Sequence, residues 1–107
     1  MVSVPQVSKG LITFIEQELV AQATNKQKFM MYFLMPQIPQ KVEQLFKEYK
    51  DNMLISDYIK PEGIDLDGLY KASKVAINKS GNIELLGIIF NEQDIDKLYG
   101  YITRAIV

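Results

Sequence analysis

The helical spacing of the apolar side chains, interrupted at several points by proline and glycine, is the feature that most restricts the fold of this chain. Pro5 suits the first turn of a helix, and apolar residues follow it at i, i+4, i+7 and i+8. This pattern predicts a first helix over residues 5–23. Thr24 or Asn25 can cap a second helix, which Pro36 is expected to end.

Three further helices are predicted from the same signals. Apolar residues repeat at helical spacing over residues 40–51, which predicts a third helix. Asp65 is suited to cap a fourth helix at its start, and Gly81 to end it. Asn91 with Asp94 three positions later resembles a capping box, so a last helix should run almost to the C-terminus.

Residues 83–90 do not have helical spacing and are rich in branched side chains, which predicts an extended segment. An extended segment needs a neighbour for its backbone hydrogen bonds. Residues 53–59 could supply that strand, as could the same segment of a second copy or a peptide from a partner. Residues 53–60 are too short to assign, and either continue a helix or form a strand.

The expected fold is therefore mainly α: a bundle of four to five helices with one short β element near residues 83–90, which residues 53–59 can pair. A chain of 107 residues with 48% hydrophobic residues can bury one core without disulfides or metals. We expect residues 1–107 to form a single helical domain.

The residue types exclude much of enzyme chemistry. The chain has no cysteine and no histidine, so it has no thiolate nucleophile, imidazole base or thiolate zinc site. Glu92 and Asp96 lie four apart and could share acid and base roles, but acidic first turns more often complement the helix dipole. A calcium loop starting at Asp65 would place Ala76 where a bidentate Glu is required. We expect no enzyme, no cofactor and no metal.

The charges give little support for nucleic-acid binding. Twelve basic residues balance thirteen acidic ones, and Arg104 is the sole arginine. An alternative function remains, because the fourth helix has a polar face followed by an extended segment and so looks like a winged-helix regulator. Its acidic N-terminus would repel phosphates. The residues that would bind nucleic acid in this alternative are Lys71, Lys74, Asn78 and Lys79.

Neither a membrane span nor a secretory signal is expected. The densest apolar run, residues 29–35, is far shorter than the ~20 residues that cross a bilayer. The first residues lack a basic region followed by an apolar stretch. We expect a cytoplasmic protein, and in general character the chain resembles a small accessory protein of the phage type.

The run over residues 29–35 is apolar around nearly the whole helix, so it forms either core or an interface. We expect a non-enzymatic protein-interaction or assembly module that binds a protein partner or its own copy as a homo-oligomer. Its predicted interface residues are Met30, Met31, Met35, Leu85, Ile88 and Phe90.

Overall fold

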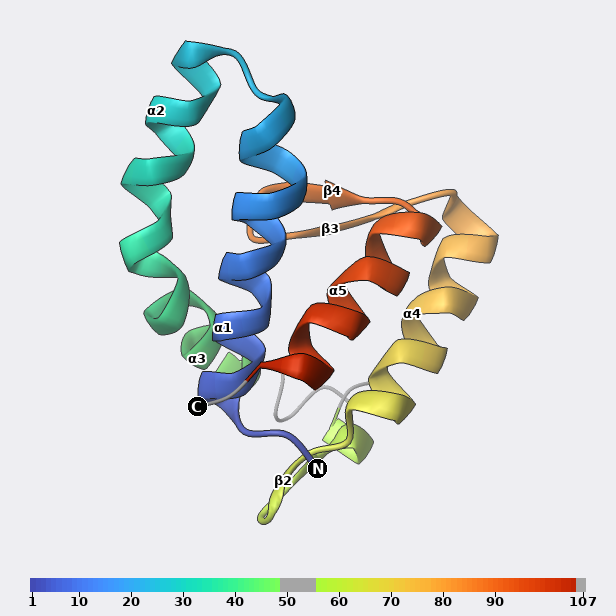
Figure 1. Ribbon diagram of the computed structural model, residues 1–107. Helices are drawn as coiled ribbons and strands as arrows, with labels where there is room; N and C mark the ends of the chain where they lie inside the picture. The colour runs from blue at the N-terminus through green and yellow to red at the C-terminus, as the bar shows by residue number, and fades with distance from the viewer. Residues whose placement is uncertain (49–55, 106–107) are drawn as a thin grey trace.

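The first helix lies at the centre of the fold and packs against both the third and the last helix. The computed structural model describes residues 1–48 and 56–105. In it, α1 (Val4–Phe14) continues through a π-helical turn, Ile15–Leu19, and a 3-10 turn, Val20–Gln22 (Figure 1). The fold is mainly helical with two small antiparallel strand pairs, which confirms the predicted class.

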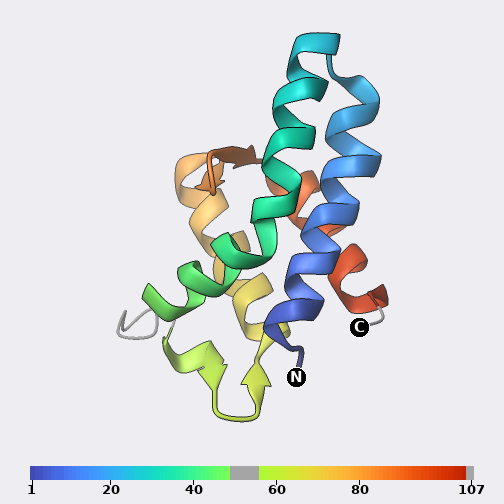
Figure 2. The same ribbon diagram turned by 90° about the vertical axis from the view of Figure 1, so that its left-hand side faces the viewer.

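The second and third helices form one bent helical path. α2 (Asn25–Leu34) leads through a 3-10 turn, Met35–Gln37, directly into α3 (Ile38–Glu48). α2 ends at Leu34, directly before the turn that contains Pro36, as predicted, but the backbone on either side of this turn remains right-handed helical. Proline is tolerated there because the first turn of a helix needs no backbone N–H donors. α1 and α2 run side by side as a helical hairpin (Figure 2).

The fourth and fifth helices lie against each other on the other side of α1 (Figure 1). α4 (Leu66–Ser80) begins at Asp65, whose carboxylate accepts a backbone N–H, and ends at Gly81 with φ 86°. α5 (Glu92–Arg104) begins with the capping box predicted at Asn91. These local start and stop signals are confirmed.

Two short strands precede α4. Ser56–Tyr58 forms a 3-10 turn and leads into β1 (Ile59–Lys60), which pairs antiparallel with β2 (Gly63–Ile64). Val2 extends this pair on the other edge through backbone hydrogen bonds of 2.8 and 3.0 Å to β2. The segment expected to be helix or strand is therefore a turn and a strand from Ser56 onward, and residues 53–55 lie outside the described residues.

The extended segment before α5 pairs with itself. β3 (Ile83–Leu85) and β4 (Ile88–Phe90) form an antiparallel hairpin whose two turn residues, Leu86 and Gly87, both have positive φ. This is the backbone of a type I′ turn, whose twist suits a two-residue hairpin. Pairing with residues 53–59, one of the alternatives considered, is not found for the described part of that segment, because Ile59 pairs with β2 and the chain reverses inside residues 83–90 to supply its own second strand.

The core lies between α1, α3, α5 and the hairpin. The ring of Phe14 packs 5.4 Å from that of Phe90 and 6.3 Å from that of Tyr101. Gly10 lets α1 approach α5 so closely that a side chain at this position would meet the backbone of Ile102. The buried core cluster contains Leu11, Phe14, Ile15, Val20, Ile38, Val42, Ile77, Phe90 and Ile95.

Candidate interaction surface

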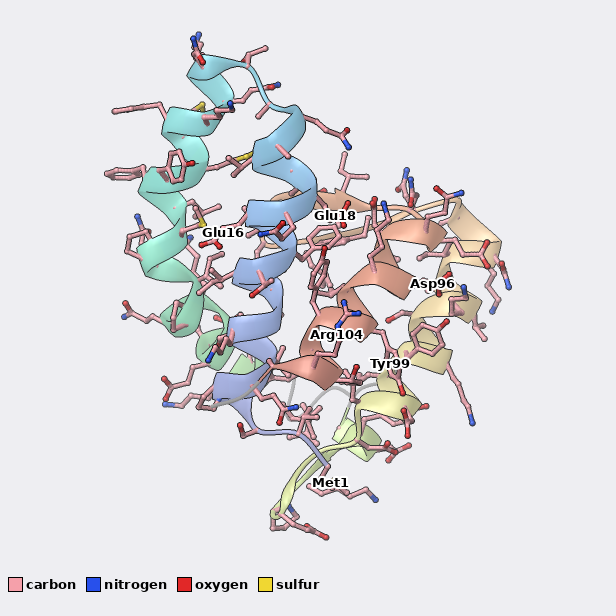
Figure 3. The ribbon with its side chains drawn as sticks, in the orientation of Figure 1. Met1, Glu16, Glu18, Asp96, Tyr99 and Arg104 are labelled. Atoms are coloured by element: carbon pink, nitrogen blue, oxygen red, sulfur yellow. The ribbon has the colours of Figure 1, made fainter. Side chains whose placement is uncertain are left out.

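α2 is the one α-helix of the described chain that contributes no buried residue. Four large apolar side chains of this helix are exposed to solvent: Phe29 by 76%, Met30 by 63%, Tyr32 by 57% and Phe33 by 72%. Side chains on the outer edge of α2 extend away from the rest of the molecule (Figure 3). We call these four residues the aromatic–methionine face.

The core sets which side of α2 faces outward. Met31, Leu34 and Met35 pack against the core cluster, and at 3.6 residues per turn this turns the aromatic–methionine face away from it. The start of α2 is fixed by a capping box in which Thr24 and Gln27 exchange hydrogen bonds of 3.0 and 3.3 Å. The face is thus presented on a well-formed helix rather than on a loop.

Among the residues that the structure describes, large apolar side chains are exposed at three other points, each on a different element. These are Met1 at the N-terminus, Val75 on α4 and Ile89 on β4. Scattered single residues of this kind are normal on protein surfaces. The four side chains of the aromatic–methionine face instead gather within two turns of one helix and expose on the order of 500 Å². The largest apolar patch of a typical monomer covers about 300–600 Å² and is often functional, which makes this face the candidate interaction surface.

The predicted interface residues separate into three groups. Met30 belongs to the aromatic–methionine face. Phe90 is 1% exposed and lies in the core. The other four are partly buried and pack against the core: Met31, Met35, Leu85 and Ile88.

The sequence reasoning selected the methionines of the run and missed its three aromatic residues. Phe29, Tyr32 and Phe33 are the larger part of the exposed surface. The available signal was the spacing of Leu34 and Ile38, which share one side of the helical path and therefore place Phe29 and Phe33 on the other.

The lysine side of α4 is partly neutralised by α5. Lys74 Nζ lies 3.0 Å from Glu92 Oε1 and 2.8 Å from Asp96 Oδ1. Tyr70 donates its hydroxyl to the same Asp96 oxygen at 2.5 Å. Of the other residues proposed for nucleic-acid binding, Lys71, Asn78 and Lys79 are exposed on α4.

This cluster favours a charged Asp96. The hydrogen bonds from Lys74 and then from Tyr70 lower the pKa of the Asp96 carboxyl, and the same contact with Asp96 raises the pKa of the Tyr70 hydroxyl. A general acid at neutral pH needs a raised carboxyl pKa. Glu92 and Asp96 share one side of α5, as predicted, and that side binds Lys74.

The carboxylates of Asp67 and Asp65 also accept hydrogen bonds within the chain. Asp67 accepts a hydrogen bond from Tyr99, whose ring lies 4.6 Å from that of Tyr70 (Asp96 and Tyr99 are labelled in Figure 3). Asp65 caps α4. Within residues 1–48 and 56–105, no group of three or more acidic side chains could hold a metal ion.

The surface has shallow depressions that are open to solvent. One of about 440 Å³ lies where α1 meets the end of α5 and is lined by Lys9, Thr13, Tyr101, Arg104 and Ala105. Arg104 lies over the Tyr101 ring at 5.2 Å, and the Tyr101 hydroxyl donates to Glu18 at 2.7 Å. A second, of about 200 Å³, is lined by residues of α3 and by Leu86. Both are open to solvent rather than enclosed, unlike most small-molecule sites.

In the part of the chain that the structure describes, no helix combines the length and apolarity needed to span a bilayer. Comparison of the chain with protein-family models, with curated proteins and with solved structures found no match.

Proposed function

We propose that this protein is a non-enzymatic interaction module that self-associates through the aromatic–methionine face. The observation that carries the proposal is the exposure of Phe29, Met30, Tyr32 and Phe33 on a helix with no buried residue. At about 25 cal/mol per Å², covering on the order of 500 Å² would release roughly 10 kcal/mol before the costs of association. This free energy is a strong reason for the face to bind a partner.

The polar chemistry supports the same proposal indirectly. A chain without histidine or cysteine would depend on carboxylates, tyrosine or lysine for catalysis. Asp96 accepts hydrogen bonds from Tyr70 and Lys74. These contacts stabilise the ionised Asp96, the protonated Tyr70 and the protonated Lys74. The ion pairs of Lys74 also weaken the nucleic-acid alternative, because they neutralise one of the cations on which it depends.

Light scattering over a range of protein concentrations tests the proposal. We expect the natural chain to have a molecular mass above that of one copy, and Phe33→Asp to reduce it to one copy while helical circular dichroism is retained. Ile89→Asp is the matched control, because Ile89 is similarly exposed at 64% but lies on β4. A natural chain that stays monomeric at its highest soluble concentration would refute the proposal.

A further inference from the structure

We infer that the partner at the aromatic–methionine face is a second copy of this chain, whose α2 packs antiparallel to the first across a two-fold axis. The inference rests on the proposed function and adds the orientation and register of the second copy. Three features of the α2 surface support it: the spacing of the outer residues, the distribution of charge, and the exposed area.

The outer side of α2 carries a stripe at coiled-coil spacing. Lys26, Met30, Phe33 and Gln37 follow at i, i+4, i+7 and i+11, and all four are exposed. The stripe continues to Gln37 because the backbone stays helical through the 3-10 turn. An antiparallel partner with its axis between residues 31 and 32 places Met30 against the partner's Phe33. Sulfur–aromatic contacts of this kind are favourable.

Charge selects the antiparallel orientation. Lys26 and Lys28 lie in the first turn of α2, which has no acidic residue. A parallel pair would bring the two copies of Lys26 and two positive helix ends together. An antiparallel pair separates them and places Lys26 opposite the partner's uncharged Gln37.

The exposed area fits a second copy. The stripe of each copy, with Met30, Phe33 and the flanking Phe29, would bury on the order of 800 Å² in the pair, which is the size of a small, weak interface, and Tyr32 would stay outside the contact. A two-fold axis achieves this with one surface, because each copy offers the same patch to the other. The dimer should therefore dissociate on dilution.

The absence of cysteine makes the orientation directly measurable by disulfide formation. In the antiparallel pair Lys26 lies opposite the partner's Gln37, whereas the two copies of Lys26 are eleven residues, or about 16 Å, apart along the helix. A disulfide needs Cα atoms closer than about 7 Å. Lys26→Cys mixed with a mass-tagged Gln37→Cys should therefore give a mixed disulfide several-fold faster than either variant alone. Both changes leave the four apolar side chains intact.

Lys71→Cys mixed with Gln37→Cys is the control, because Lys71 is an exposed lysine on α4. Crosslinking of Lys26→Cys with itself as fast as with Gln37→Cys would mean parallel packing and would overturn the inference. A dimer that Phe33→Asp dissociates, but in which no mixed disulfide forms, would also overturn it and leave the proposed function standing. A monomeric natural chain would overturn both.

Discussion

α2 and α5 are both exposed on one side, but their outer sides are chemically opposite. α5 buries Ile95 and Ile102 against the rest of the molecule, and its outer carboxylates and tyrosines bind residues of α1 and α4. α2 buries no residue completely and exposes aromatic rings. The polar side chains on the outer side of α5 thus have partners within one copy, whereas the outer side of α2 presents apolar side chains to solvent.

The sharpest test of this difference is a pair of identical truncations. Phe14 is fully buried under α5 and Phe33 is 72% exposed on α2. We expect Phe14→Ala to lower the free energy of unfolding by about 3–5 kcal/mol, because it leaves a core cavity. Phe33→Ala should change the stability of the monomer by less than about 0.5 kcal/mol.

Urea denaturation at a concentration that keeps the chain monomeric measures both values. Similar losses from the two truncations would contradict the distinction, since they would mean that the side chain of Phe33 is covered within one copy.

A second pair of variants tests how closely α5 packs. A Cβ added at Gly10 would lie 2.5 Å from Ile102 Cγ1 and 2.6 Å from its Cα, so the two helices must separate. Gly10→Ala should cost about 1–3 kcal/mol. At Gly100, on the same helix pair, the nearest atom is 3.5 Å away in the flexible Arg104 side chain.

Gly100→Ala is therefore the control and should stabilise α5 by about 0.5–1 kcal/mol, because glycine is the poorer helix former. Thermal denaturation followed by circular dichroism would show shifts of opposite sign. A neutral Gly10→Ala would mean that the contact of α1 with α5 is looser than described.

Local signals were readable from the sequence, and contacts between distant residues were not. Thr24, Asp65 and Asn91 each act on an amide within three residues, so the helix starts could be predicted. The turn at Leu86–Gly87 was missed because leucine rarely adopts positive φ and the usual Asn-Gly signal is absent.

The exposure of the apolar side chains on α2 could be predicted only in part. The apolar run over residues 29–35 identified the helix. Which of its sides faces outward depends on where Ile38 and Val42 enter the core, and that packing involves α1, far away in the sequence. The ion pair of Lys74 with Asp96 could not be predicted from the sequence for the same reason, because the two residues are 22 positions apart.

Ser8 is a buried polar residue that differs from the polar side chains of α5 in its hydrogen bonding. It is 3% exposed on α1, and its hydroxyl oxygen has no hydrogen-bond partner among the residues described. We expect Ser8→Ala to stabilise the fold by about 1 kcal/mol, because burying an unsatisfied polar atom is costly.

Ser3→Ala is the control for the loss of a serine hydroxyl that is used. Ser3 accepts the backbone N–H of Gln6 at 3.1 Å as the N-cap of α1, so its removal should destabilise by about 1 kcal/mol. Chemical denaturation compares the two variants. A destabilising Ser8→Ala would indicate that the hydroxyl makes a hydrogen bond after all.

The smallest expected effect concerns the polar side of α5, whose contribution to stability should depend on pH. The pKa of Asp96 is lower in the folded state, so its contribution is present above about pH 4 and is lost as the pH falls through the folded pKa. The pKa of Tyr70 is raised, so its contribution is present below about pH 10 and is lost as the pH rises through the folded pKa. Lys74→Met should raise the pKa of Asp96 in an NMR titration and move the acid loss of thermal stability to higher pH, whereas Lys71→Met should leave both unchanged. If Lys74→Met left the Asp96 titration unaltered, the ion pair would be absent in solution, and the contrast between α5 and α2 would rest only on the tyrosine hydrogen bonds of α5.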